Sequence, residues 1–299
     1  MEHNTTMRGP KLMEFPHLLD SHRDLMVGLV SAADTRLHSH LLPSSVSVPS
    51  DVEYYENPGG VVLLSHLLPN PRSTSDIGLS FIYFLSYSSS AWIDFILVSW
   101  LRIALPTGGG MNVTNIQGYL KPTTDAPHFQ FELVQLSPTF LIFFLDLTPR
   151  KDLVLHPDYL KTFYEDTQLE ARRKQLESQV PESNHYFSSS LYFRNVVSPT
   201  GILVGIKCDE EDGAGRVEEI IRSHISPIAN EVLEIWMESC VCRGAAASVG
   251  ENERAELEKR DRMIKSKAVD MDLSSSMPKQ FGQEVADRVL GVIRGIFRI

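Results

Sequence analysis

The sequence predicts an α+β fold, an α/β/α sandwich in which a central, mostly antiparallel sheet is flanked by helices on both faces. Two observations predict it: the segments run in the order helix, strands, helices, and one strand-like run is apolar almost throughout, as in a strand covered on both sides. No internal repeat and no obvious linker interrupts the chain. We therefore expect a single domain over residues 1–299.

The first element is an amphipathic helix at about residues 16–41. Its apolar residues recur at helical spacing, at Leu18, Leu19, Leu25, Met26, Leu29 and Val30. Strands are expected next at residues 92–105, 111–120, 128–135 and 139–147. The last of these contains the almost wholly apolar run "FLIFFL", which indicates a central position in the sheet.

The second half of the chain returns to helices. Residues 156–179 read as one helix with Pro157 in its first turn, and residues 191–198 and 202–208 read as strands. Residues 216–240 suggest two helices broken near Pro227, and the charged segment 251–267 suggests a solvated helix. A terminal helix at 278–299 would present one apolar face, made of Phe281, Val285, Val289, Val292 and Ile296.

Residues 61–90 are out of character with the rest of the chain. The segment is apolar and serine-rich without a steady period, and its stretch from 77 to 93 carries no charge. Seventeen such residues fall just short of a membrane span, and Asp94 follows directly. Sheet strands or a poorly ordered insertion are the favoured interpretations, and a membrane-anchored interaction protein remains an alternative.

Composition excludes several classes of function. A formal net charge of -10 in 299 residues disfavours nucleic-acid binding, which depends on Lys and Arg. Three cysteines, Cys208, Cys240 and Cys242, form neither a disulfide framework nor a CxxC pair, so no metal centre is expected. The first 15 residues show neither an apolar signal core nor a long Ser/Arg-rich stretch typical of a transit peptide.

Familiar catalytic motifs are missing from the sequence. "PTGGGMN" at 106–112 lacks the lysine of a phosphate loop, and GxGxxG, GxSxG and HExxH do not occur. Single histidines such as His128 and His156 are interpreted as surface or capping residues. Motifs alone therefore indicate only a soluble mixed α/β domain.

Longer stretches of the sequence are more informative than these short motifs. "MEFPHLLDSHRDLM", "DLTPRKDLVLHPDYLKTFYEDT", "SPTGILVGIKCDEE", "HISPIANEVLEIWMESC" and "MPKQFGQEVADRV" together resemble the red chlorophyll catabolite reductase family of land plants. The similarity covers residues 13–42 and 92–299 and fails at 61–90, where the family has a shorter polar strand. We interpret 61–90 as an erroneous translated insertion that replaces this strand, and expect it to be poorly ordered.

The resemblance implies a fold like that of ferredoxin-dependent bilin reductases, with an open-chain tetrapyrrole held between sheet and helices. The implied reaction reduces the C20/C1 methine double bond of red chlorophyll catabolite to give primary fluorescent chlorophyll catabolite. Reduced ferredoxin would supply the electrons, with no metal or flavin bound. The resemblance also implies the chloroplast stroma, a homodimer and a possible association with the upstream pheophorbide oxygenase. A carrier of the same fold that binds the pigment without reducing it is the alternative.

Two acids match the family's catalytic carboxylates, Glu132 in "FELVQ" and Asp272 in "VDMDLSSSMPKQFG". Each electron that enters the pigment adds negative charge, so protons must follow, and a carboxylic acid whose pKa is raised by burial can supply one. Strand alternation places Glu132 on one face with Gln130 and Val134. The bland alternative is a wet strand face for Glu132 and a solvated helix end for Asp272 and its neighbour Asp270.

Val197, in "RNVVSPTG", matches the position that chooses which face of the pigment is protonated in the family. We expect it to line the pocket and influence product stereochemistry; on sequence grounds alone it is an ordinary core residue. Ferredoxins are acidic, as is this chain, so docking requires a local basic patch. The candidates in the sequence are Arg150, Lys151, Arg172, Arg173 and Lys174.

Overall fold

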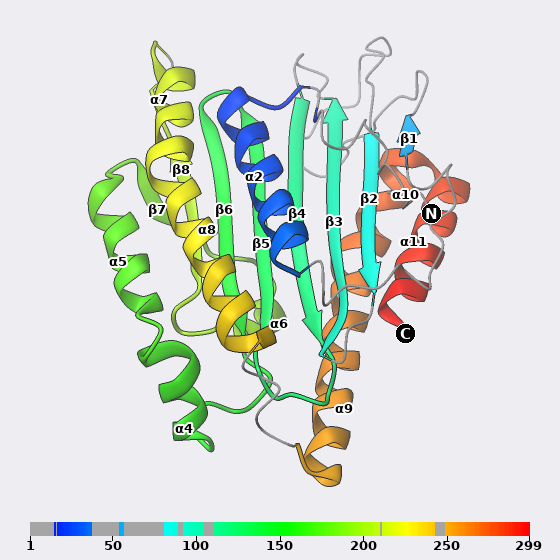
Figure 1. Ribbon diagram of the computed structural model, residues 1–299. Helices are drawn as coiled ribbons and strands as arrows, with labels where there is room; N and C mark the ends of the chain where they lie inside the picture. The colour runs from blue at the N-terminus through cyan, green and yellow to red at the C-terminus, as the bar shows by residue number, and fades with distance from the viewer. Residues whose placement is uncertain are drawn as a thin grey trace, which may run out of the picture.

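The computed structural model describes residues 15, 17–37, 54–56, 81–88, 92–104, 110–209, 211–242 and 249–299. They form an eight-stranded sheet between two layers of helices (Figure 1), which confirms the predicted α+β sandwich. The strand order is β1-β2-β3-β4-β5-β6-β8-β7, and every neighbouring pair is antiparallel.

The four strands predicted for the middle of the chain are confirmed as β3 to β6. The sheet consists of β1 Tyr54–Glu56, β2 Phe81–Ser88, β3 Ile93–Ala104, β4 Gly110–Leu120, β5 His128–Ser137, β6 Phe140–Thr148, β7 Ser183–His185 and β8 Ile202–Lys207. β5 and β6 are central and have helices over both faces (Figure 1). This double cover explains why β6 is nearly all apolar, as a strand without a wet face must be.

Part of the unusual segment 61–90 is a sheet strand. β2 pairs with β3 over its whole length, from Phe81 opposite Arg102 to Ser88 opposite Phe95. A strand there is not a membrane helix, and no helix in the described part of the chain is long and apolar enough to cross a membrane. Residues 61–80, 89 and 90 lie outside the described residues, so the insertion hypothesis stays a prediction.

One helical layer packs on the face of the sheet nearer the viewer in Figure 1. It contains α2 Asp20–Leu37 and a continuous run of α7 Gly213–Ile220, η2 Ile221–Ile225, α8 Ser226–Ile235 and η3 Trp236–Cys242. The predicted break near Pro227 is therefore wrong. A π-helical turn precedes the proline, with Ser226 N–H donating to Ile221 O, and the helix continues past a residue that has no N–H to donate.

A second group of helices lies along the edge of the sheet beyond β6. The helix predicted at 156–179 is divided into α4 Pro157–Leu160, η1 Lys161–Glu165 and α5 Leu169–Gln179. Gln168 separates η1 from α5 because its φ of 59° is left-handed, which an α-helix does not accommodate.

The layer on the far side of the sheet comprises α6 Leu191–Val196, α9 Glu251–Ala268, η5 Val269–Leu273, α10 Ser274–Phe281 and α11 Gln283–Phe297 (Figure 1). The strand predicted at 191–198 is wrong, because Ser190 caps a short helix by accepting a hydrogen bond from Phe193 N–H. The predicted terminal helix is two helices, since Gly282 has a φ of 80°. α11 packs Val289, Ile293 and Phe297 against the sheet.

Candidate functional site

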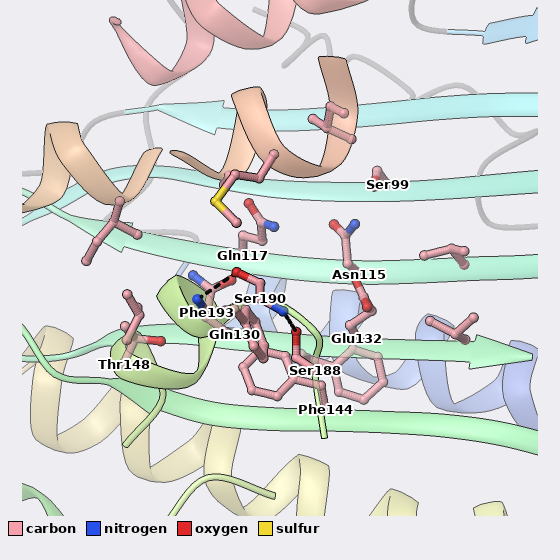
Figure 2. Close-up of a pocket in the computed structure, with 18 of the residues that line it drawn as sticks. Ser99, Asn115, Gln117, Gln130, Glu132, Phe144, Thr148, Ser188, Ser190 and Phe193 are labelled. Carbon is pink, nitrogen blue, oxygen red and sulfur yellow. Dashed lines mark hydrogen bonds between the residues drawn. The ribbon is translucent and has the colours of Figure 1, made fainter. Parts of the chain in front are cut away.

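A cavity of about 490 Å³ lies between the sheet and the α6, α9–α11 layer. That volume is within the range of sites that hold a large organic ligand. Its walls are mostly apolar and aromatic, and its floor carries a small set of polar side chains from β3 to β6 (Figure 2). These floor residues are Ser99, Asn115, Gln117, Gln130, Glu132 and Thr148.

Glu132 stands at the centre of this floor. It lies on β5 between Asn115 of β4 and Phe144 of β6, its partners in the sheet register. Gln130 and Val134 line the cavity with it, whereas Phe129 and Leu133 are buried in the core on the opposite face. The strand alternation therefore placed Glu132 correctly, and the face is that of a cavity, not an open wet surface.

Two amide side chains beside Glu132 have oxygens without a hydrogen-bond partner among the described residues. They are Asn115 Oδ1 and Gln117 Oε1, both buried. Figure 2 shows these amides on β4 next to Gln130 and Glu132 on β5. Because buried polar atoms in proteins are nearly always paired, these two acceptors suit N–H donors of a bound ligand or water in the cavity.

Val197 lies in the wall of the cavity, in the segment between α6 and β8. Asp146 on β6 holds that segment: Ser198 donates its backbone N–H to Oδ2 at 3.1 Å and its hydroxyl to Oδ1 at 2.5 Å. Thr148 donates its hydroxyl to Oδ2 at 3.2 Å. The predicted specificity residue is thus positioned by a buried carboxylate that the sequence analysis did not single out.

Asp146 should make stability depend on pH. Burial raises the pKa of Asp146 to about 6, against the lowering effect of its hydrogen bonds from Ser198 and Thr148. An unfolded aspartate titrates near about 3.9, so the folded protein binds this proton more tightly. The stabilisation that the protonated Asp146 side chain contributes is therefore complete below about pH 4 and is lost as the pH rises through about 6.

We expect Asp146→Asn to abolish this dependence. Between about pH 4 and 6 the wild type should lose up to roughly 3 kcal/mol of unfolding free energy relative to the variant. Urea unfolding of both proteins at pH 4, 5, 6 and 7 measures the difference. Parallel pH profiles would contradict the prediction.

Asp272 lies in η5, on the opposite side of the cavity from the sheet. Its two neighbours in sequence, Met271 and Leu273, both line the cavity. Asp270 is exposed, and its Oδ1 lies 3.9 Å from Arg294 Nη2, as expected for a residue on a solvated helix. The tertiary structure thus brings the segment that carries Asp272 over the cavity whose floor carries Glu132, although the two acids are 140 residues apart in sequence.

Beside the cavity, α9 is fastened to the sheet by buried charges. Asp261 accepts two hydrogen bonds from Arg150, Nε to Oδ1 at 3.1 Å and Nη2 to Oδ2 at 2.6 Å. His128 Nε2 lies 3.0 Å from Asp261 Oδ1. One turn further along, Lys265 Nζ lies 2.8 Å from Asp94 Oδ2. These contacts hold the helix that roofs the cavity.

His128 is neutral in this network. Burial lowers its pKa to about 4, and Asp261 opposes only part of that shift. Nδ1 accepts a hydrogen bond from Leu120 N–H, so the proton of the neutral ring is on Nε2 and is donated to Asp261. The interpretation of His128 as a surface or capping residue is wrong, because its ring is fully buried.

Burial tends to raise the pKa of Asp261, yet Arg150 and His128, which is protonated at the acid pH where Asp261 titrates, hold that pKa well below its usual range by charge and hydrogen bonds. Since His128 is neutral at neutral pH, Arg150 supplies the positive charge. The solvated helix expected at 251–267 is therefore solvated on one side only, with Asp261 and Lys265 turned into the protein.

The basic patches predicted for ferredoxin docking are already engaged. Arg150 is 2% exposed and bound to Asp261. Lys151 pairs with Asp125 and Glu253, and on α5 the remaining candidates pair with glutamates: Arg172 with Glu231, Arg173 with Glu170 and Glu177, and Lys174 with Glu170. Cations that are neutralised within the chain attract an acidic partner poorly, so these candidates are not supported.

Among the described residues, no group of three or more His, Cys, Asp or Glu side chains could hold a metal ion. Cys208 and Cys240 are buried free thiols, and burial raises the pKa of both.

A sequence model of the red chlorophyll catabolite reductase family matches residues 21–295. The chain belongs to this family.

Named relatives agree with the assignment. The chain is 41% identical to "Red chlorophyll catabolite reductase, chloroplastic" of Arabidopsis thaliana, over its full length and 86% of that protein. It is 37% identical to "Red chlorophyll catabolite reductase 1, chloroplastic" of rice, over 93% of this chain and 78% of the relative. It is 40% identical to red chlorophyll catabolite reductase of barley, over 69% of this chain and 98% of the relative.

The fold of this reductase family member is also found in a tetrapyrrole enzyme. The crystal structure of tomato phytochromobilin synthase in complex with biliverdin matches with a TM-score of 0.59 at 17% identity. The match covers 90% of this chain and 83% of the synthase. At that identity the similarity establishes the shared fold, which agrees with the bilin reductase fold expected from the sequence.

Proposed function

We propose that the protein reduces the C20/C1 methine double bond of red chlorophyll catabolite, an open-chain tetrapyrrole, and so forms primary fluorescent chlorophyll catabolite. The observation that carries the proposal is the cavity floor, where Glu132 lies opposite Asn115 and next to the pair of Gln117 and Gln130, and where the oxygens of Asn115 and Gln117 have no partner among the described residues. Pyrrole and lactam N–H groups would donate hydrogen bonds to such oxygens. The apolar walls suit the conjugated rings.

Reduction of a carbon–carbon double bond adds two electrons and two protons. Reduced ferredoxin supplies the electrons one at a time, in keeping with the family and with the bilin reductase fold. Glu132 donates a proton from the sheet side, and Asp272 donates from the η5 side. A site with an acid on each side lets each protonation follow its electron, so that charge does not accumulate on the pigment.

The relatives from Arabidopsis and rice are named chloroplastic, which supports the same compartment for this chain. A homodimer and an association with the upstream pheophorbide oxygenase are parts of the proposal that rest on the family resemblance.

The test is an anaerobic incubation of the purified protein with red chlorophyll catabolite and photoreduced ferredoxin, followed by the blue fluorescence of the product. We expect fluorescence to grow with time and to require both pigment and reduced ferredoxin. Pigment binding without fluorescence would instead support the carrier of the same fold. That outcome would overturn the reductase assignment.

Val197 offers a separate prediction about stereochemistry. Val197→Phe should change the ratio of the two product epimers by about tenfold, since a reshaped apolar contact is worth about 1–3 kcal/mol of discrimination. Chromatographic separation of the epimers measures the ratio. Val154→Phe is a matched control, because Val154 is 89% exposed and does not line the cavity. An unchanged epimer ratio in Val197→Phe would remove Val197 from this role.

A further inference from the structure

One face of α9, continued by η5, carries exposed cations and methionines that lead to the cavity. We call this set the α9 stripe; it consists of Lys259, Arg262, Met263, Lys267 and Met271. Most of its members follow one another at four-residue spacing, which places them on one side of the helix. Met263 is 50% exposed and Met271 38% exposed, and Lys267 and Met271 also line the cavity.

The cations of the α9 stripe differ from the basic residues predicted by sequence. Lys259, Arg262 and Lys267 make no ion pair with any residue that the structure describes. By contrast, Lys151 and the basic residues of α5 are bound to neighbouring carboxylates. Among the described residues, the stripe is thus a group of exposed basic side chains without an ion pair that lies next to the cavity.

The two helical layers also differ in total charge. In the layer of α2 and residues 211–242, the sequence has four basic and ten acidic residues, a net charge of −6. On the cavity side, the first two turns of α9 are acidic. Counted whole, α6 and residues 251–299 have eleven basic and nine acidic residues, a net charge of +2, and the positive charge lies from Lys259 to Ile299, with nine basic and five acidic residues. An acidic protein would therefore be repelled from one face and attracted to the other.

We propose that the α9 stripe is the docking surface for the electron donor, an acidic protein that carries a one-electron centre. The inference rests on the proposed function, which requires such a donor. The cations steer the acidic partner and orient it. The exposed methionines form an adaptable apolar contact, and the position of Lys267 and Met271 at the cavity brings the donor's redox centre next to the bound pigment.

The test compares two double charge reversals in the full-length protein. K259E/R262E changes the stripe without altering a residue that lines the cavity. K174E/R222E changes net charge equally on α5 and η2, where Lys174 is 68% and Arg222 62% exposed. Two measurements are made on each: calorimetric binding of oxidised plant-type ferredoxin, and ferredoxin-dependent product formation. Pigment binding, followed by absorbance, verifies that the cavity is intact.

We expect K259E/R262E to weaken ferredoxin binding and raise the KM for ferredoxin by about tenfold at low ionic strength, with the difference shrinking as salt is added. The charge-conserving variant K259R/R262K should behave as wild type, and K174E/R222E should change little. Equal effects of the two charge reversals, or none from K259E/R262E, would overturn the docking surface. Ferredoxin binding that depends on the stripe without any pigment reduction would overturn the proposed function and leave the surface standing.

Discussion

Asp261→Asn should lower the free energy of unfolding by about 3–5 kcal/mol. The substitution preserves shape but removes the negative charge that compensates Arg150, whose side chain is buried. An uncompensated guanidinium inside a protein loses hydration without gaining an ion pair, and this is the source of the large cost. The same change releases α9 from the sheet, so weaker pigment binding is expected as well. Urea unfolding with a common m-value measures the loss.

A matched control is Asp166→Asn. Asp166 also pairs with a cation, Lys161, but both side chains are more than half exposed. The loss there should be within about 0.5 kcal/mol. Arg150→Met together with Asp261→Asn should cost less than the sum of the two single changes, because the double variant leaves no buried charge unpaired. If Asp261→Asn costs no more than Asp166→Asn, the buried pair does not hold α9.

Glu132→Gln should reduce product formation by about 10²–10⁴-fold while pigment binding is retained. The amide keeps the size of the carboxyl group and its place between Asn115 and Phe144, but it cannot donate a proton to the pigment. Initial rates of fluorescence under saturating reduced ferredoxin measure the effect. Absorbance titration with the pigment separates lost chemistry from lost binding.

Asp272→Asn is expected to reduce the rate in the same way, and Asp270→Asn is its control. Asp270 is two residues away in η5, is exposed and lies near Arg294, so its loss should leave the rate unchanged. If both acids serve one sequence of proton transfers, their effects on the rate are not multiplicative. The double variant Glu132→Gln, Asp272→Asn should then be only slightly slower than the slower of the two single variants. A wild-type rate in either single variant would exclude that acid as a proton donor.

Local pattern was sufficient for the central sheet. In β5, alternating residues separate the cavity face from the core face, and in β6 the run "FLIFFL" reports cover on both sides. These signals depend only on neighbours along the chain, so the sequence reveals them. Family strings added Glu132, Asp272 and Val197, which no spacing rule would have selected.

The local sequence pattern predicted the wrong element where a single contact or dihedral angle determines the secondary structure. The hydroxyl of Ser190 caps a helix at 191–196 that reads as a strand by composition, and Gly282 divides the terminal helix. Near Pro227 the chain avoids a break by one π-helical turn. Each of these local features contributes only about 1–3 kcal/mol to stability. That is comparable to the summed secondary-structure propensities of the residues that favour the alternative conformation.

The sequence by itself determined the fold class, the central strands, the cavity face of β5 and the family. Only the tertiary structure decided which charges are buried and which are free. Asp261 is 111 residues from Arg150 and 133 from His128, and this pairing neutralises Arg150, whereas the cations of the α9 stripe have no ion pair among the described residues. The physical reason is that a charge is defined by its surroundings in space: desolvation and partners set its state, and neither can be read from neighbours along the chain.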